Sequence, residues 1–399
     1  MMHYIKRCTP LVLHPTCQSR RNGMLGAPAA ACIVTLAATP IVLVCMRRLA
    51  AIDEVTARSS HQAPTPRGGG IAVVLGLFAG VLVLVLTQGG ADSPDLLPLT
   101  AAAALFGLIG LAEDIGGVTA MRRLALHTAT SFVVAAMAVL GAVLGDAAPG
   151  LLLVLLVTVA APVWITGFVN VFNFMDGING ISAVTAALAG GAFAALGAAR
   201  DLPTLTAGGI LVAASALGFL PFNFPRARVF LGDVGSYALG AVLAVLAVQA
   251  VLAGVPPESA LAPCALYLAD TTATLARRIR AGEQWYSPHR SHAYQRLTIA
   301  GWSHVRVTGL VGATTAVLVV LSLAAFGPLP GRLAADGAAG LVLLAYLRAP
   351  RWAARRGRTA ARPRPTRPAT PPPRQPARLP TQRRTDDEPG RRAAPGTTR

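Results

Sequence analysis

The chain has 399 residues, of which 54% are hydrophobic and only 13% are charged. A soluble protein of this length needs more polar residues to cover its surface, so the composition excludes an ordinary soluble globular fold. Because a chain crosses the hydrocarbon layer only as helices or as a closed barrel, and the apolar segments here are long, we predict an all-α, polytopic integral membrane protein.

Eleven apolar segments approach the roughly 20 residues that a helix needs to span a bilayer. The predicted spans are 27–46, 69–88, 98–112, 124–145, 150–169, 182–199, 205–220, 236–254, 259–275, 304–326 and 331–348. Residues 1–23 contain no apolar core long enough for a signal peptide, so we expect translation to start at Met24. The expected membrane domain is then 24–349.

Arginine residues are concentrated in alternate connections between these spans. They are Arg47, Arg48, Arg58 and Arg67, then Arg122 and Arg123, then Arg226 and Arg228, then Arg277, Arg278, Arg280, Arg290 and Arg296. By the positive-inside bias these connections face the cytoplasm of a cell inner (plasma) membrane protein. With an odd number of spans, the N-terminus lies outside and the C-terminal tail lies inside.

The tail, residues 350–399, supplies most of the net charge of +18. Its fourteen arginines are interleaved with Pro, Thr and Gly, which leaves no apolar face around which a domain could fold. We expect a disordered cytoplasmic tail that binds anionic lipid headgroups. Nucleic acid is a less favoured partner, because Trp352 is the one aromatic residue among these arginines.

Acidic residues are sparse near the spans, where each costs about 2.5 to 3.5 kcal/mol close to a helix centre. Glu113, Asp114, Asp176, Asp233 and Asp270 all fall at predicted cytoplasmic ends. Glu113, Asp114 and Asp270 are expected to close the C-terminal ends of helices, where the helix dipole disfavours negative charge. A divalent cation with neighbouring arginines would offset this cost, so we predict a metal and phosphate site at the cytoplasmic face.

The segment NVFNFMDGINGIS, residues 170–182, interrupts two apolar spans with polar residues. Four of them recur every three positions, namely Asn170, Asn173, Asp176 and Asn179. This spacing predicts that they share roughly one side of a helical or partly unwound segment. Gly177 and Gly180 follow two of them directly and would let backbone amides approach a ligand. An ordinary polar loop with helix caps is the alternative.

Three further segments have a composition suited to phosphate binding. In FLGDVGSYALG, 230–240, Asp233 precedes a predicted helix whose first N–H groups would face a phosphate, and the carboxylate of Asp233 would hold Mg²⁺. In SPHRSHAYQRL, 287–297, His289, Arg290 and His292 suit a diphosphate better than zinc, because no third ligand completes a site. In PTPRGGG, 64–70, Arg67 is either a phosphate contact or a positive-inside flank beside a flexible hinge.

These segments, in this order, resemble the polyprenyl-phosphate N-acetylhexosamine-1-phosphate transferases of glycosyltransferase family 4. They are most similar to the O-antigen-type branch, which uses UDP-GlcNAc and undecaprenyl phosphate, and the resemblance covers about residues 27–348. Two positions depart from the commonest pattern: Glu113 stands in an acidic pair that is usually Asp-Asp, and Asn179 replaces the second acid of a DGxDG motif.

The resemblance implies an enzyme that transfers N-acetylhexosamine-1-phosphate from a UDP-sugar to polyprenyl phosphate and releases UMP, the initiating membrane step of cell-envelope polysaccharide synthesis. It implies Mg²⁺, with Mn²⁺ as the alternative, held by Asp233, Asn173 and Asp176. Catalytic roles would belong to Asp114, Asp176 and Glu113. Substrate contacts would come from His289, Arg290, His292, Arg67, Asn170, Gly177 and Asn179.

Other interpretations stay open at this point. A transporter would also place ionisable residues at broken helices, but near the bilayer midplane and with internal symmetry. A catalytically inactive relative would explain the Glu113 and Asn179 departures. A homodimer is compatible with the sequence, and the identity of the sugar is not encoded in any motif named above.

Overall fold

The computed structural model describes residues 15–53, 64–88, 95–145, 149–284, 289–326 and 328–360. The chain divides into a unit of residues 1–357 and a second unit of residues 358–399. Most of the expected leader and most of the expected tail lie outside the described residues.

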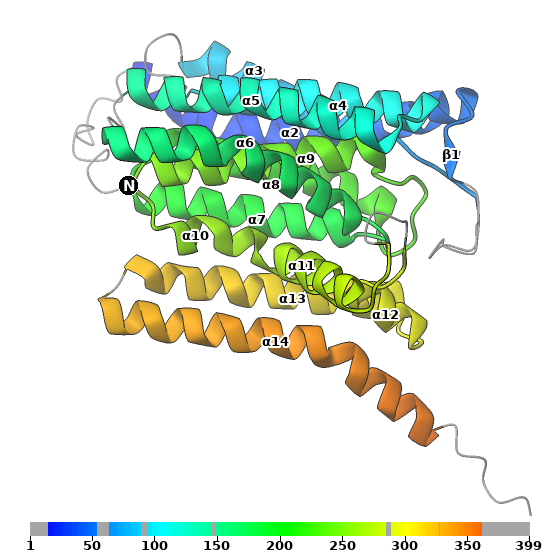
Figure 1. Cartoon of the computed structure of the whole chain (residues 1–399). Coiled ribbons are helices and arrows are strands. Elements are labelled where there is room, and N and C mark those ends of the chain that lie inside the picture. Colours follow the sequence, from blue (N-terminus) through cyan, green and yellow to red (C-terminus); the bar gives the residue numbers. More distant parts are fainter. Residues whose placement is uncertain are drawn as a thin grey trace, which may run out of the picture. The chain divides into compact units, whose positions relative to one another are not determined.

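Helices dominate the described part of the chain (Figure 1), which confirms the predicted all-α class. They are α2 (Pro15–Arg48), α3 (Gly70–Gln88), α4 (Leu97–Gly116), α5 (Ala120–Leu144), α6 (Leu151–Phe174), α7 (Ile181–Ala199), α8 (Pro203–Asn223), α9 (Gly232–Leu252), α10 (Pro257–Leu261), η2 (Ala262–Cys264), α11 (Ala265–Arg280), α12 (Ala293–Ile299), α13 (His304–Ser322), η3 (Leu323–Phe326) and α14 (Leu329–Ala360). Two short strands, β1 (Ile52–Asp53) and β2 (Thr65–Pro66), pair antiparallel with Ile52 opposite Pro66.

Ten helices of the described residues are long and apolar enough to cross a membrane, so the protein is a multi-pass membrane protein. The predicted span 259–275 differs, because it falls on three consecutive pieces, α10, η2 and α11. Pro263 lies in the short 3₁₀ piece, and a proline there cannot donate the hydrogen bond of a continuous α-helix.

Most predicted spans are shorter than the helices that the structure shows, and the differences at α4 and α14 bear on the site and on the domain boundary. The span 98–112 becomes α4, which continues through Glu113 and Asp114 to Gly116. The span 331–348 becomes α14, which contains Pro350, passes the expected domain boundary at 349 and is bent (Figure 1). Hydropathy marks where apolar sequence stops, whereas the helix continues for as long as its backbone hydrogen bonds are favourable.

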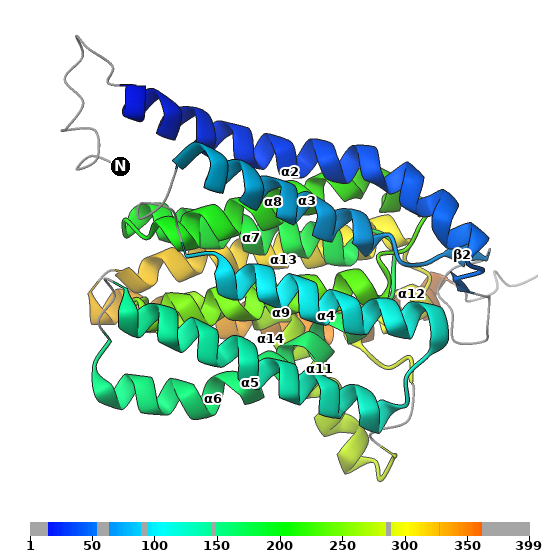
Figure 2. The same cartoon turned by 90° about the horizontal axis from the view of Figure 1, so that it is seen from above.

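Helix α9 is the centre of the bundle. In an apolar 18-residue window of α9, 89% of the residues are buried, against 17% in the corresponding window of α14. Its sequence is apolar around the whole circumference, as expected for an interior helix, and it contacts α3, α4, α5, α6, α7 and α8 (Figure 2). The first residues of α9, which include Asp233, are therefore held at the middle of one end of the bundle.

Candidate active site

The connections that carry the motifs meet at one end of the bundle, where β1 and α12 lie in Figure 1. The PTPRGGG segment runs directly along the FLGDVGS segment. Phe230 N donates to Pro66 O at 2.8 Å, Gly69 N donates to Phe230 O at 2.9 Å, and Gly70 N donates to Leu231 O at 2.8 Å. The predicted meeting of these two motifs, more than 160 residues apart, is thus observed as backbone pairing.

Two glycines allow this close approach. Gly232 has φ +74°, and a Cβ on it would lie 2.5 Å from Asp114 Oδ2. A Cβ on Gly70 would collide with the backbone of Gly235. Only glycine combines the left-handed conformation at residue 232 with space for the neighbouring carboxylate.

Asp114 caps the N-terminus of α9. Its Oδ1 accepts from Asp233 N at 3.1 Å and its Oδ2 accepts from Val234 N at 3.0 Å, and the residue is only 1% exposed. The positive end of α9 therefore stabilises a carboxylate at the unfavourable C-terminal end of α4. The expectation that these two N–H groups face a phosphate is wrong, because Asp114 already occupies them.

Cations lie beside both members of the acidic pair. Arg67 Nε is 3.7 Å from Asp114 Oδ1, and Arg123 Nη1 is 3.6 Å from Glu113 Oε1. The sequence predicts a metal ion that stabilises these acids. The structure shows the N-terminus of α9 and Arg67 as stabilising partners of Asp114, and Arg123 as the partner of Glu113.

Asn173 and Asp233 are in contact, as the predicted metal site requires. Asn173 Nδ2, on α6, donates to Asp233 Oδ1 at 2.6 Å and to Ser236 Oγ at 3.0 Å. Asp176 follows in the turn after α6. Burial raises the pKa of Asp176 to about 8, and the negative charges of Asp233 and Asp114 act in the same direction. The carboxylates thus form an acidic cluster that a cation would stabilise.

The donor chemistry of this cluster fits Mg²⁺. Among the described residues no group of three or more His, Cys, Asp or Glu side chains is arranged to hold a metal ion. Asp233 and Asp176 offer hard oxygen ligands, and the amide of Asn173 would offer a third after rotation. Mg²⁺ commonly takes one or two carboxylates and completes its shell with water and substrate phosphate. The residues therefore fit a cation bound together with substrate, and do not form a complete cage.

Asn170 lies near the cluster in sequence but has different partners. Its Nδ2 donates to Thr166 O at 2.8 Å and is 3.3 Å from Nδ1 of His127 on α5. Asn170 therefore connects α6 to α5, while Asn173, one turn later, connects α6 to α9.

Asn179 is also held by structural contacts. Its side-chain Nδ2 donates to Pro225 O at 3.1 Å, and its backbone carbonyl accepts from Thr308 Oγ1 at 2.8 Å. The prediction that all four residues spaced by three share one side is wrong for Asn179, which follows the end of α6, whereas Asn170 and Asn173 lie one turn apart on that helix. Helix α6 ends at Phe174, so helical periodicity no longer determines where the later residues point.

The basic segment before α12 lies beside the turn that carries Asp176. Tyr294 Oη donates to Phe174 O at 3.0 Å, and a Cβ on Gly177 would collide with the same hydroxyl. Gly177 therefore makes room for Tyr294, a structural reason that the motif alone did not reveal. Tyr294 belongs to the basic motif 287–297, and no local pattern indicates its contact with a turn more than a hundred residues away.

The three basic residues of this segment differ in exposure. His292 is buried, at 3% exposed, with Nδ1 3.4 Å from Asp270 Oδ1. His289 is half-buried, and its Nδ1 is 3.0 Å from Ser291 Oγ; Arg290 is also half-buried. The imidazole rings of His289 and His292 are 5.1 Å apart. His289 and Arg290 are thus better exposed to a substrate than His292.

Asp270 was expected at the C-terminal end of its helix, beside a metal. It lies instead in the middle of α11, which continues to Arg280. Sequence reasoning placed the end of the span too early, because the residues after 275 are strongly basic and do not resemble a membrane helix.

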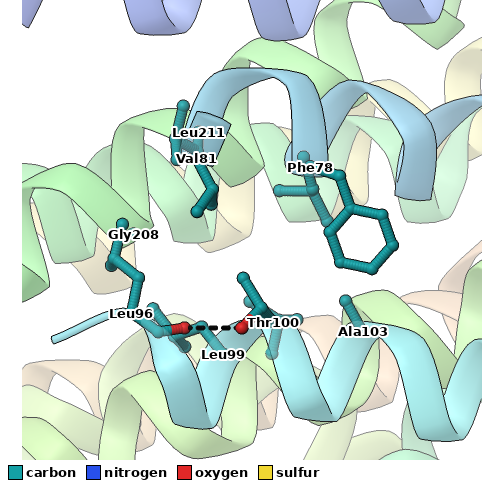
Figure 3. Close-up of a pocket in the computed structure, with 10 residues that line it drawn as sticks. Phe78, Val81, Leu96, Leu99, Thr100, Ala103, Gly208 and Leu211 are labelled. Atoms are coloured by element: carbon teal, nitrogen blue, oxygen red, sulfur yellow. Dashed lines mark hydrogen bonds between the residues drawn. The ribbon is translucent and has the colours of Figure 1, made fainter. Parts of the chain in front are cut away.

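A separate pocket between α3, α4, α8 and α9 is apolar (Figure 3). It is lined by Leu77, Phe78, Val81, Leu96, Leu99, Thr100, Ala103, Gly208, Leu211 and Val242. Its hydroxyl, on Thr100, donates to Leu96 O at 3.1 Å. Leu96 precedes the first turn of α4, at the opposite end of that helix from Asp114, so this pocket is not part of the polar site.

Comparison with known proteins identifies the family. Residues 96–251, from the start of α4 to the end of α9, match the model described as "Glycosyl transferase family 4". A decaprenyl-phosphate N-acetylglucosaminephosphotransferase of Mycobacterium leprae is 32% identical over 333 residues, which cover 73% of this chain and 80% of the relative. The chain belongs to the polyprenyl-phosphate N-acetylhexosamine-1-phosphate transferases.

Other members of this transferase family are similar over shorter lengths. A probable undecaprenyl-phosphate N-acetylglucosaminyl 1-phosphate transferase of Bacillus subtilis is 28% identical over 300 residues, 70% of this chain and 79% of the relative. A phospho-N-acetylmuramoyl-pentapeptide-transferase of Symbiobacterium thermophilum is 32% identical over 248 residues, 56% of this chain and 73% of the relative. The matched model includes Asp114, Asn173, Asp176 and Asp233, whereas Arg67 and His289 lie outside it.

Proposed function

We propose that this protein transfers N-acetylhexosamine-1-phosphate from a UDP-sugar to a polyprenyl phosphate and releases UMP. The observation that carries the proposal is the meeting of Asp114, Asn173 and Asp233, from three helices, at the end of the bundle where the arginine-bearing connections lie. The names of the relatives support a polyprenyl phosphate acceptor and make GlcNAc the first sugar to test.

In this reaction an oxygen of the acceptor phosphate attacks the β-phosphorus of the UDP-sugar. The bond from that phosphorus to the bridging oxygen breaks, and UMP leaves with the oxygen. A phosphate monoester has its second pKa near about 6, so the acceptor is already mostly dianionic at neutral pH and needs little help from a base. The enzyme's main task is to position anionic groups and to stabilise the charge on the leaving UMP.

The residues divide this task. Asp233 and Asp176 would hold Mg²⁺, or Mn²⁺ as the alternative, and the cation would neutralise phosphate oxygens of the donor. Asn173 orients Asp233 through its 2.6 Å hydrogen bond. Asp114 has both oxygens occupied by backbone N–H groups, so its proposed role is to fix the start of α9 rather than to take a proton.

Positive side chains would complete the phosphate site. His289 and Arg290 lie in the basic segment that contacts the Asp176 turn, and Arg67 lies in the PTPRGGG segment beside Asp114. Glu113 is paired with Arg123, which favours an electrostatic role over proton transfer. For the buried His292 we propose support of this segment, and for Asn170, Gly177 and Asn179 we propose that they shape the site through the contacts described above.

The location of the site would be the cytoplasmic face of the cell inner (plasma) membrane, because the arginine-rich connections are at that end. We further propose that residues 24–349 are the membrane domain and that the tail, 350–399, binds anionic lipids. The transporter alternative is disfavoured, since the acids gather at one end of the bundle and not at its middle.

The experiment uses membranes from a host that lacks its own transferase of this class. They are incubated with radiolabelled UDP-GlcNAc, Mg²⁺ and undecaprenyl phosphate, and both the lipid-linked product and UMP are measured. We expect product from the wild type and none from Asp233→Ala at equal protein level. If the wild type forms no product with UDP-GlcNAc, UDP-GalNAc or a deoxy-HexNAc donor, the protein is an inactive relative and the proposal fails.

A further inference from the structure

The carboxylate of Asp270 is buried, at 0% exposed, and accepts hydrogen bonds from three parts of the chain. Its Oδ1 accepts from Ala293 N at 2.8 Å and from Thr274 Oγ1 at 3.3 Å. Its Oδ2 accepts from Tyr294 N at 3.3 Å and from Tyr346 Oη at 2.8 Å. A buried carboxylate that is bound on both oxygens is expensive to disturb and holds its partners in fixed positions.

The same carboxylate faces an imidazole of the basic segment. His292 Nδ1 lies 3.4 Å from Asp270 Oδ1, and both side chains are buried. At this distance the pair makes an electrostatic contact rather than a close hydrogen bond, and the contact restricts where the buried ring can lie. The His292 ring in turn lies beside that of His289, with centroids 5.1 Å apart, so its orientation affects the more exposed histidine.

Asp270 also affects the turn that carries Asp176, because it binds the backbone of Tyr294. Asp270 holds the backbone of Tyr294, and the hydroxyl of Tyr294 donates to Phe174 O at 3.0 Å. Phe174 is the last residue of α6, two positions before Asp176. One carboxylate on α11 therefore fixes both the basic segment and the turn that carries an acid of the proposed metal site.

We propose that Asp270 is a positioning residue for phosphotransfer, which sets the placement of the basic segment 289–292 relative to Asp176 through His292 and Tyr294. This inference rests on the proposed function for its kinetic consequence. The inference also predicts that loss of the Asp270 carboxylate loosens segment 289–292, and this structural effect can be measured whether or not the protein is active. Asp270→Asn keeps one carbonyl oxygen but loses the second acceptor, so it cannot bind Ala293 N and Tyr294 N together.

The kinetic test compares purified wild type, Asp270→Asn and the control Glu258→Gln, which neutralises an acid on the neighbouring α10. We expect Asp270→Asn to lower kcat/KM for the UDP-sugar by about tenfold or more, as is usual for carboxylates that orient a histidine, with Glu258→Gln within twofold of wild type. In His292→Ala, the added Asp270→Asn change is expected to cost much less than it does alone. If the fold-loss of kcat/KM in the double variant equals the product of the losses in the two single variants, Asp270 does not act through His292.

The structural test is hydrogen–deuterium exchange on the same folded variants. Faster exchange is expected in residues 289–299 and 174–180 of Asp270→Asn, with the rest of the bundle unchanged. Exchange like that of the wild type in both segments would overturn the inference. If the wild type itself shows no transfer, the proposed function fails, and the exchange experiment still decides whether Asp270 positions the segment.

Discussion

The contact between Asp114 and the start of α9 gives the sharpest prediction. In Asp114→Asn, the amide keeps one acceptor oxygen but turns an NH₂ group toward the second backbone N–H. The side chain can then bind Asp233 N or Val234 N, but not both. A hydrogen bond to a charged group contributes about 1.5 to 3 kcal/mol, and a favourable charge at a partly buried helix end contributes up to about 2 kcal/mol.

The expected loss of unfolding free energy is therefore about 2 to 4 kcal/mol, which a domain of ordinary stability survives. Activity should fall much further, because a shift of about 1 Å in the start of α9 would displace Asp233, and such misplacement can cost about 100-fold in rate. The measurements are thermal unfolding in detergent and GlcNAc-1-phosphate transfer in membranes at equal protein level.

A matched control is Asp336→Asn, which removes the charge of an exposed acid on α14. It should leave both the melting temperature and the transfer rate near those of the wild type. The reasoning is refuted if Asp114→Asn melts at the wild-type temperature and retains transfer within twofold. Loss of activity with unchanged stability would instead show that Asp114 acts on substrate and not as a cap.

Three further predictions follow from the same geometry. Gly232→Ala should cost at least about 1 to 3 kcal/mol of unfolding free energy, measured by thermal unfolding, because φ is +74° and the added Cβ meets Asp114; an unchanged melting temperature would contradict this. Asn179→Asp should cost about 1 kcal/mol, since a carboxylate cannot donate to Pro225 O; this can be measured by the same method, with Asp336→Asn as control. Chelation should abolish transfer, and added Mg²⁺ should restore it. Because the pKa of Asp176 is raised to about 8, this acid must lose a proton to bind the cation, so half-maximal activity should need more Mg²⁺ as the pH falls from 8 to 6. A Mg²⁺ requirement that does not change with pH would exclude Asp176 as a ligand.

Hydropathy and charge were sufficient to predict the all-α membrane fold and most of the spans. Ten of the predicted spans correspond to the ten long apolar helices of the described residues, because length and apolar composition are local properties. The remaining one, 259–275, was predicted as a single helix but is built from three pieces around Pro263. Hydropathy did not indicate that break, since the segment is mostly apolar over its first eleven residues, 259–269.

The motifs correctly predicted that Asn173 and Asp233 lie together, since an amide and an acid in two glycine-containing motifs are typical ligands of one site. The role of Asp114 was not predictable in the same way. Its partners are 119 and 120 residues away, and no local pattern specifies which helix end a carboxylate will cap. The spacing of three did not place Asn179 for a related reason, because the end of α6 at Phe174 is fixed by tertiary contacts such as that with Tyr294.

The caps on α9 and α12 have a consequence for how the membrane domain can be divided. Asp114 precedes the amides that it binds by more than a hundred residues, and Asp270 precedes Ala293 by 23. A fragment that ends at Asn223, after α8, would keep seven of the ten long apolar helices of the described residues, yet its Asp114 would lack the two backbone N–H donors of α9. The helices from α4 to α9 are therefore expected to be stable only as one cooperative unit, and splitting the gene between them should yield two fragments that are stable only when produced together.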